Sequence, residues 1–470
     1  MSSTDLPPLL RLPLHTIAHI LSNVKTIQDL RPIILSHSIF RDALKDNFNS
    51  VASAIIMRQV AKEALPFLLA LVGSQRLSLS DPAAAKQLLG LAASTCPVAL
   101  PSLGLSRAEY AYMSSSCSSA RTIYRQMASE VKPLHHSYLG PAPKDRQYAN
   151  HWEKFRISRA VFRYQLMCNL FCHRLCLIRM QEFRPRFDDW DLKRLFFSSF
   201  SPWVNEELMC VFVYLRRKVA QAYDDITLHD VSLNHERIEA IPDVNFISQI
   251  HWMLCMGLPF LSRIASGGTL RSTGVPQFST GRSATRAYNP HTILLCSKLV
   301  PGQLTLNPPL RDPALPMHAW EKSQILQLDP QRAPQNSPFR AWLGAHFKNS
   351  ISRTVCCDAD TNLWFLGYVL WTSPREAAPP LEEVYETCKR VRVAEPIFPR
   401  PGKEWGKDDH LRSRRQRKDI YRAGGEGFWP REGGDWSEIY GLTEAQKKTL
   451  EAKWLHEGLT ESTRESSGTK

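Results

Sequence analysis

Hydrophobic residues over the first 265 positions recur at spacings of three and four, which is typical of amphipathic helices, whereas strand-like alternation is scarce. Capping residues mark three of the helix starts. Asp81 and Ser201 each precede a proline that suits a first helical turn, and Ser106 forms a capping box with Glu109. We therefore expect helices to begin near residues 82, 107 and 202 of an all-α fold.

A longer helix is expected between Tyr148 and Glu182, because this stretch contains neither glycine nor proline. It should be the longest helix of the protein. Arg156, Arg159 and Arg163 recur within it at spacings of three and four. Charged side chains that share one face of a helix predict that this face is exposed to solvent.

The N-terminal segment predicts three short helices separated by polar breaks. Lys25 interrupts the first apolar run, Asp29 is a suitable N-cap for the second helix, and Ser38 is one for the third. Three helices in fewer than about fifty residues bury too little apolar surface to be stable alone. We therefore expect this segment to cover its apolar side chains with a partner surface.

The pattern LPLHTIAHILSNV…DLRPIILSHSIFRDAL in this segment resembles the F-box motif, with its register LPxE-I-xx-IL-xx-L…DL…S-xx-F. Two later stretches, which begin at Glu153 and Phe200, are similar to the helical body of large filamentous-fungal F-box-like proteins. In the F-box family, the leading Leu-Pro pair and the following Ile and Leu positions contact the small adaptor subunit of cullin-RING ubiquitin ligases. The resemblance implies that the interface or supporting residues are Leu12, Pro13, Ile17, Ile20, Leu21, Leu30 and Phe40.

The pattern and composition predict five regions. An F-box-like three-helix bundle at 8–50 should pack against a larger, irregular helical body at 51–265. Gly, Ser and Thr dominate residues 266–290, which predicts a flexible linker or loop, and the proline-rich region 291–395 should be mixed but mainly helical. Residues 396–470 are expected to form a poorly ordered basic tail with a short terminal helix.

Two further apolar patterns lie in the C-terminal half. The dense apolar and aromatic stretch from Thr361 to Trp371 predicts a buried strand or a helix, of which we favour the helix. Near the C-terminus, Thr443 and Gln446 make a capping box and Gly458 is a suitable stop. The terminal helix is therefore expected between these two signals.

The charge of the chain is concentrated in one segment. Lys and Arg number 59 against 45 Asp and Glu, a net charge of +14, and residues 389–422 supply +7 of it with twelve basic and five acidic residues. Three interpretations stay open: a solvated tail, a nuclear-import signal, or an arm that contacts nucleic-acid phosphates while Trp405, Tyr421, Phe428 and Trp429 stack on bases. The basic positions are Arg412, Arg414, Arg415, Arg417 and Lys418.

Motifs for metal or cofactor chemistry are weak. Cys168, Cys172 and Cys176 share one stripe of the expected long helix, next to His173. A straight helix spaces the first and third of these cysteines about 12 Å apart, too far for one ion, so a packed apolar face is the better interpretation. The polar residues of 224–235 would act in chemistry only if they lined a deep pocket. We expect no catalytic residue, no metal site and no cofactor.

Taken with the resemblance, these patterns predict a non-enzymatic adaptor that recruits a protein client to a cullin-RING ubiquitin ligase. The alternative is a nuclear nucleic-acid-associated protein, although nucleic acid is the less favoured partner. Eleven cysteines without regular spacing favour reduced thiols inside the cell, in the cytoplasm and/or the nucleus. The uncharged stretch between Lys86 and Arg107 is interrupted by Pro97 and Pro101, so we expect no membrane partner.

Overall fold

The computed structural model describes residues 11–77, 81–93, 100–139, 150–172, 190–200, 202–233, 236–237, 250–268, 362–371, 407–430 and 433–467. Helices make up most of this part, which confirms the all-α class. Its strands form two antiparallel ladders of two residues per strand: β1 (Ser232–Leu233) with β2 (Glu236–Arg237), and β3 (Glu426–Gly427) with β4 (Ile439–Tyr440). The expected linker beyond residue 268 and most of region 291–395 lie outside the described residues.

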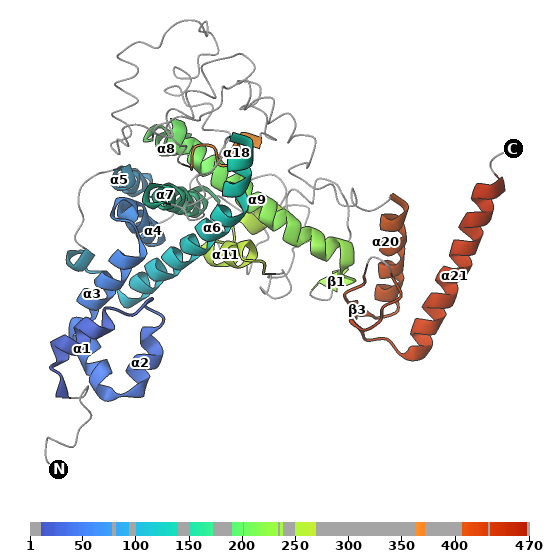
Figure 1. Cartoon of the computed structure of the whole chain (residues 1–470), viewed down its shortest axis with the longest axis horizontal. Coiled ribbons are helices and arrows are strands. Elements are labelled where there is room, and N and C mark those ends of the chain that lie inside the picture. The colour runs from blue at the N-terminus through green and yellow to red at the C-terminus, as the bar shows by residue number, and fades with distance from the viewer. Residues whose placement is uncertain are drawn as a thin grey trace, which may run out of the picture.

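The three expected N-terminal helices are α1 (Leu14–Leu21), α2 (Leu30–Ser36) and α3 (Ser38–Gln59). Both α1 and α2 pack against α3, so α3 is the spine of this N-terminal bundle (Figure 1). The bundle has a small hydrophobic core that is distinct from the main core of the molecule. Its buried residues are Ile17, Ala18, Leu21, Leu30, Ala43, Leu44, Val51 and Ile55.

The spine helix also joins the bundle to the body. The expected boundary at residue 50 falls inside α3, which continues to Gln59 through a kink at Asn47 (φ −121°, ψ 17°). Beyond the kink, Ala52 and Ile56 belong to the main core. No proline or glycine interrupts the helix at the boundary, so the two cores share one continuous element.

Hydrogen bonds fix the end of α1 on the end of α3. The Arg58 guanidinium donates to the carbonyl oxygen of Val24 at 2.9 Å and to Oδ1 of Asn23 at 3.0 Å. The Gln59 amide donates to the carbonyl oxygen of Lys25 at 2.8 Å. These donors hold the loop that follows α1 against the end of α3.

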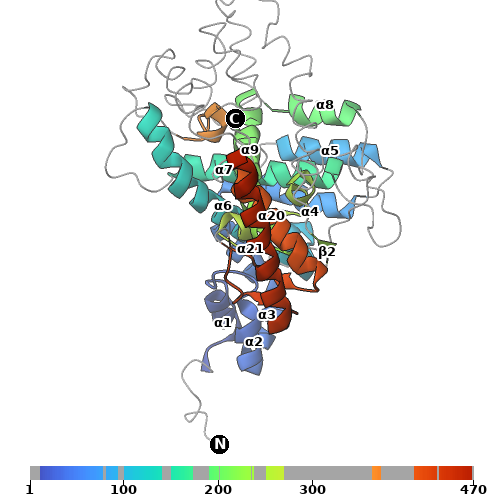
Figure 2. The same cartoon turned by 90° about the vertical axis from the view of Figure 1, so that its right-hand side faces the viewer.

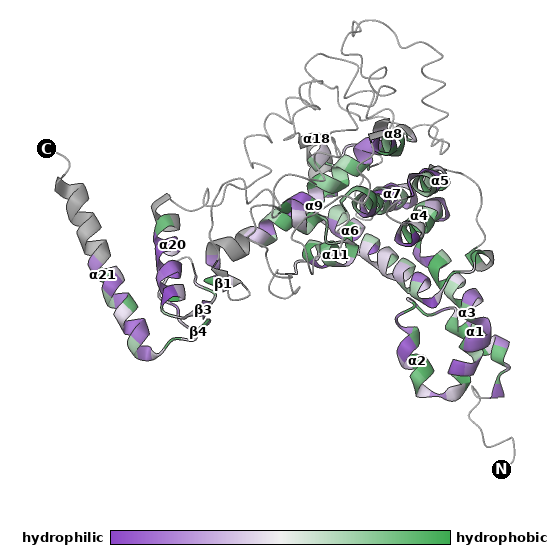
Figure 3. Ribbon diagram, turned by 180° about the vertical axis from the view of Figure 1, so that it is seen from behind, coloured by the Kyte–Doolittle hydropathy of each residue, from purple (hydrophilic) through white to green (hydrophobic). Residues whose placement is uncertain are grey.

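The body surrounds a large core, and its helices start where the caps predict, at residues 82, 107 and 202 (Figures 1 and 2). Its helices are α4 (Leu65–Arg76), α5 (Pro82–Ala93), α6 (Arg107–Leu139), α7 (His151–Met167), α8 (Trp190–Ser198), α9 (Pro202–His229), α11 (Leu258–Ala265) and the one-turn α18 (Asn362–Phe365). Short 3-10 turns span Lys62–Ala64 and Leu100–Leu103. Figure 3 shows α11 and parts of α9 in the colour of hydrophobic residues.

The described part of the expected long helix covers residues 151–172, and residues 173–182 lie outside the described residues. It begins at His151, capped by Asn150 and Glu153 in a capping box, and after Met167 it becomes a π-helical turn, Cys168–Cys172. The longest helix in the described part is α6, with 33 residues, and it includes Pro133. A proline is thus tolerated within α6, where neighbouring packing stabilises the helix.

The prediction of a solvent-exposed arginine stripe on α7 was wrong. Arg156, Arg159 and Arg163 are all buried, because α7 lies between α4, α6 and α9. Arg159 forms a two-pronged ion pair with Glu207 of α9, with N to O distances of 2.7 and 3.0 Å. Buried charges persist in a protein interior when they are paired and hydrogen-bonded, and α9 supplies that pairing.

The other two arginines donate to backbone carbonyls and to a side-chain amide oxygen. Arg163 donates to the carbonyl oxygen of Val204 at 2.8 Å and to Oδ1 of Asn205 at 2.7 Å. Arg156 donates to the carbonyl oxygen of Leu370 at 2.9 Å, which holds residues 362–371 against the body. Burial and the neighbouring Arg159 charge lower the pKa of Arg163 to about 9.

The segment around α18 is helical only over Asn362–Phe365 and then makes tight turns. Gly367 adopts φ +62°, which a residue with a side chain rarely takes up, and this ends the helix. The preference for helix over strand is thus confirmed for one turn. Trp364 and Trp371 are both buried, so the segment packs as expected of its composition.

The C-terminal region is an ordered module over residues 407–430 and 433–467, contrary to the expected poorly ordered tail. It consists of α20 (Lys407–Arg422), the β3–β4 ladder and α21 (Glu444–Ser467). The predicted capping box at Thr443 is present, whereas α21 continues through Gly458 instead of stopping there. We refer to this unit as the C-terminal module; in Figure 3 its α20 is mostly in the hydrophilic colour.

Three tryptophans explain why this polar region is ordered. Trp429, Trp436 and Trp454 lie with ring centroids 4.8 to 5.7 Å apart, and Trp429 is fully buried. Each indole N–H donates to a side-chain oxygen, those of Gln416, Glu451 and Asp419. Aromatic rings bury a large apolar area per residue, so three of them form a small core.

The module is joined to the end of α9 by backbone hydrogen bonds. The amide of Trp429 donates to the carbonyl oxygen of His229 at 2.8 Å, and the amide of Val231 donates to that of Gly427 at 2.9 Å. Figures 1 and 2 show the N-terminal bundle and the C-terminal module at different places on the molecule, with the body between them in Figure 1. The body therefore carries two separate appendages.

We expect the buried Arg159–Glu207 pair to contribute strongly to stability. Glu207→Gln removes the negative charge beside a buried guanidinium and should lower the free energy of unfolding by about 3 kcal/mol. The measurement is chemical denaturation followed by circular dichroism. The matched control is Glu130→Gln, in the partly exposed pair with Lys218, which should cost less than about 1 kcal/mol. Equal losses in the two variants would contradict the assignment.

Candidate functional site

The seven positions expected at a docking interface divide into three groups. Ile17, Leu21 and Leu30 are buried in the core of the N-terminal bundle. Leu12 and Phe40 are half-buried against that core. Pro13 and Ile20 are exposed, and their spacing of seven residues places them on one side of α1. The structure therefore assigns most of the predicted positions to folding and leaves two of them on the surface.

Two leucines outside the predicted set are also exposed in this bundle. Leu14 is 39% exposed and Leu35, on α2, is 74% exposed, compared with 42% for Ile20. Sequence reasoning missed both, because the periodic pattern identifies the apolar stripe of each helix and does not say which of its residues the partner helix covers. We call Pro13, Leu14, Ile20 and Leu35 the exposed apolar set of the bundle.

The exposed apolar set is concentrated. In the described part of the chain, nine large hydrophobic residues are exposed, and three of them lie between residues 14 and 36. Single exposed hydrophobic residues are normal on protein surfaces, so it is their occurrence together in one small bundle that favours an interaction there. In Figure 1 the bundle extends from the body, so α1 and α2 lie away from the main core.

The basic positions of α20 do not act as one exposed patch. Arg412 and Arg415 are exposed, and Arg414 and Lys418 are partly covered. Arg417 is buried and donates to the carbonyl oxygen of Asp230 at 3.2 Å, and burial lowers its pKa to about 10. One of the five cations thus helps to hold the C-terminal module on the end of α9.

The aromatic residues near this helix are also used internally. Trp429 is fully buried, and Phe428 stacks on His229 with ring centroids 4.8 Å apart. Trp405 lies outside the described residues. Bases cannot stack on a ring that is already enclosed, so Trp429 is removed from the set of stacking candidates.

Replacing the basic side chains should show that Arg417 contributes to the stability of the fold, whereas Arg412 and Arg415 do not. Arg417→Ala should lower the free energy of unfolding by about 1–3 kcal/mol, because it removes a buried charge-assisted hydrogen bond to Asp230. The double variant Arg412→Ala and Arg415→Ala should change it by less than about 1 kcal/mol. Thermal unfolding of the three proteins measures the difference. A larger loss in the double variant would refute this division of roles.

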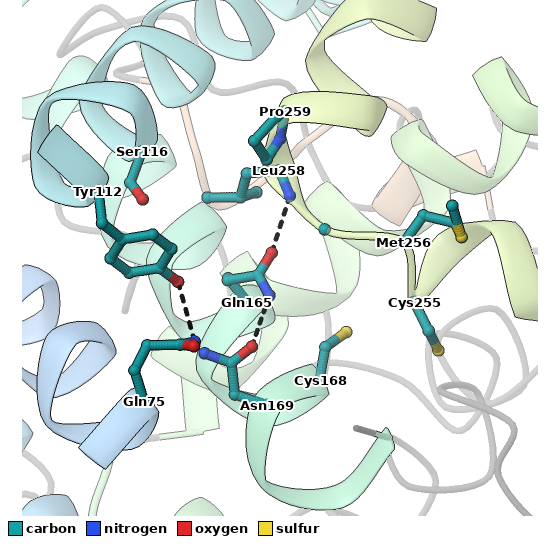
Figure 4. Close-up of a pocket in the computed structure, with 11 residues that line it drawn as sticks. Gln75, Tyr112, Ser116, Gln165, Cys168, Asn169, Cys255, Met256, Leu258 and Pro259 are labelled. Carbon is teal, nitrogen blue, oxygen red and sulfur yellow. Dashed lines mark hydrogen bonds between the residues drawn. The ribbon is translucent and has the colours of Figure 1, made fainter. Parts of the chain in front are cut away.

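A cavity of about 300 Å³ lies in the body, between α6, α7 and the segment before α11 (Figure 4). Its polar lining is connected: the Leu258 amide donates to Oε1 of Gln165, and Nε2 of Gln165 donates to Oδ1 of Asn169 at 2.7 Å. Asn169 in turn donates to Oγ of Ser74 at 2.8 Å. The lining residues are Gln75, Tyr112, Ser116, Gln165, Cys168, Asn169, Cys255, Met256, Gly257, Leu258 and Pro259.

Cysteines meet at one end of this cavity. Cys168 and Cys172 come from the π turn after α7, and Cys255 comes from the loop before α11. The three sulfur atoms all lie within 4.8 Å of one another. Hydrogen bonding of the protonated Cys172 thiol to Cys168 and Cys255, together with burial, raises the pKa of Cys172 well above its usual value. The three residues form what we call the thiol cluster.

The thiol cluster differs from the cysteine stripe expected from the sequence. Cys255 was not foreseen, because it is far from α7 along the chain and has no motif around it. Cys176 and His173 lie outside the described residues. The sequence offered one indirect signal. Cys168 and Cys172 lie one turn apart and could supply two metal ligands, so a complete site would need a further ligand from another segment.

The described residues of the polar region 224–235 are not among those that line the cavity. His229, at the end of α9, instead lies 3.3 Å from the carbonyl oxygen of Trp429 and supports the C-terminal module. Asp230 is buried beside Arg417. His229 and Asp230 therefore have structural contacts, whereas the side chains of residues 224–228 and His235 lie outside the described residues.

Comparisons with known proteins give no assignment: no family model, curated protein or solved structure matches the chain. In the described part of the chain, every helix is too short or too polar to cross a bilayer. The five cysteines in that part are free of disulfides.

Proposed function

We propose that the protein is a non-enzymatic adaptor whose N-terminal bundle docks on a partner through α1 and α2. The observation that carries this proposal is the exposed apolar set, Pro13, Leu14, Ile20 and Leu35, on a bundle whose own core is already formed by other residues. Exposure of such side chains costs free energy in water, and covering them on a partner recovers it.

The resemblance of this segment to the F-box motif suggests the partner, the small adaptor subunit of a cullin-RING ubiquitin ligase. An F-box-like protein binds this subunit with its bundle and a client with the rest of its chain, and it contributes no catalytic group. The protein would then act inside the cell, in the cytoplasm or nucleus. The buried position of Arg417 and Trp429 gives no support to the alternative of a nucleic-acid arm.

The test is co-purification of the full chain with that adaptor subunit. The double variant Ile20→Asp and Leu35→Asp places two charges at exposed positions, so it should leave the bundle core intact. Burying either carboxylate on binding is unfavourable, and we expect at least about a hundredfold loss of affinity, since interface anchors contribute about 2 kcal/mol or more.

The matched control is Leu91→Asp on α5, where the leucine is 38% exposed, close to the exposure of Ile20. This variant should bind as the unaltered chain does. Circular dichroism and the unfolding midpoint report whether each variant is folded. A folded double variant that binds the subunit with unchanged affinity, or an unaltered chain that does not bind it, would overturn the proposal.

A further inference from the structure

We propose that the thiol cluster, Cys168, Cys172 and Cys255, is a binding site for Zn²⁺, with one coordination position open to the neighbouring cavity. This inference is independent of the adaptor function, because the cluster lies in the body and shares no residue with the exposed apolar set. The chemical class of the ligand is a thiophilic cation, since three sulfur atoms are the donors.

The spacing of the sulfur atoms suits one ion. Zinc binds thiolate sulfur at about 2.3 Å, so tetrahedral ligands lie roughly 3.8 Å apart. The three sulfur atoms are already within 4.8 Å of one another, and small rotations of the side chains would close the remaining difference of about 1 Å. As each sulfur bonds to the ion, its thiol proton leaves to solvent.

Two chain segments supply the three ligands. A single straight helix would place its first and third cysteines too far apart to bind one ion. The π turn Cys168–Cys172 presents two sulfur atoms, and Cys255 closes the site from the loop before α11. π-Helical turns inside α-helices occur frequently at functional sites, because they alter the direction of the side chains that follow. This is the only grouping of three potential metal ligands among the described residues.

A hydrogen-bond network holds the two segments in register. Gln165 accepts from the Leu258 amide at 2.8 Å on the loop side and donates to Asn169 at 2.7 Å within the π turn. Asn169 is fixed in turn by Ser74 at 2.8 Å. Groups that orient the elements carrying the ligands are the usual support of metal sites, and here Gln165 connects both (Figure 4).

The cavity leaves room for a fourth ligand. Cys168 and Cys255 line it, so an ion held by the cluster would face a space of about 300 Å³ that has amide groups on its wall. Three protein ligands and one open position are typical of zinc sites that bind water or a substrate. Three thiolates leave a net charge of −1 around Zn²⁺ but −2 around Cu⁺, and burial penalises the larger charge.

The experiment is a titration of the metal-free, reduced full chain with Zn²⁺ in the presence of a chromophoric chelator. We expect one Zn²⁺ per chain, and Cys255→Ser should weaken binding at least about a hundredfold, because it removes one of three ligands. The matched control is Cys117→Ser, a buried cysteine outside the cluster, which should bind one Zn²⁺ with unchanged affinity. Cys255 is only partly buried, so its replacement is the least disruptive of the three.

Two further readouts keep the result decisive. Zn²⁺ should raise the unfolding midpoint of the unaltered chain and of Cys117→Ser but not that of Cys255→Ser. Co²⁺ should give thiolate-to-metal charge-transfer absorption that Cys255→Ser weakens. The proposal is overturned by absence of stoichiometric Zn²⁺ binding, by Zn²⁺ binding of unchanged affinity in folded Cys255→Ser, or by a disulfide within the cluster.

Discussion

Burial of positive charge in α7 is the constraint on which the body depends. Arg156, Arg159 and Arg163 are enclosed, and each requires an oxygen from another element: Leu370, Glu207, and Val204 with Asn205. A guanidinium in an apolar interior is tolerated only with such partners. Since each donor geometry is directional, these bonds fix how α9 and residues 362–371 lie against α7, whereas apolar contacts alone would permit sliding.

The same helix connects the core to the thiol cluster. α7 ends in the π turn that carries Cys168 and Cys172, and Gln165, one turn earlier, holds the loop that follows Cys255. A change in how α7 packs would therefore also change the positions of the residues that line the cavity. The N-terminal bundle is coupled to the body differently, by the continuous helix α3, against which α1 and α2 pack.

The C-terminal module shows how a strongly basic segment becomes ordered. Its α20 is rich in charge, yet Trp429, Trp436 and Trp454 form a small core, and Asp419 accepts from both Lys453 and the Trp454 indole. Burial of Arg417 adds a bond to α9. Average composition predicted a poorly ordered basic tail because three aromatic residues scattered over twenty-six positions contribute little to a local mean, although together they suffice for a small core.

The sequence by itself determined what is local: the helical class, the starts of α5, α6 and α9, the three N-terminal helices and the cap of α21, because capping and periodicity act over a few residues. Only the tertiary structure decided which faces are covered. It buried the α7 arginines and placed Cys255 beside Cys168 and Cys172. It also left Ile20 exposed while it buried the neighbouring Leu21. These outcomes depend on partners distant along the chain, which no local pattern encodes.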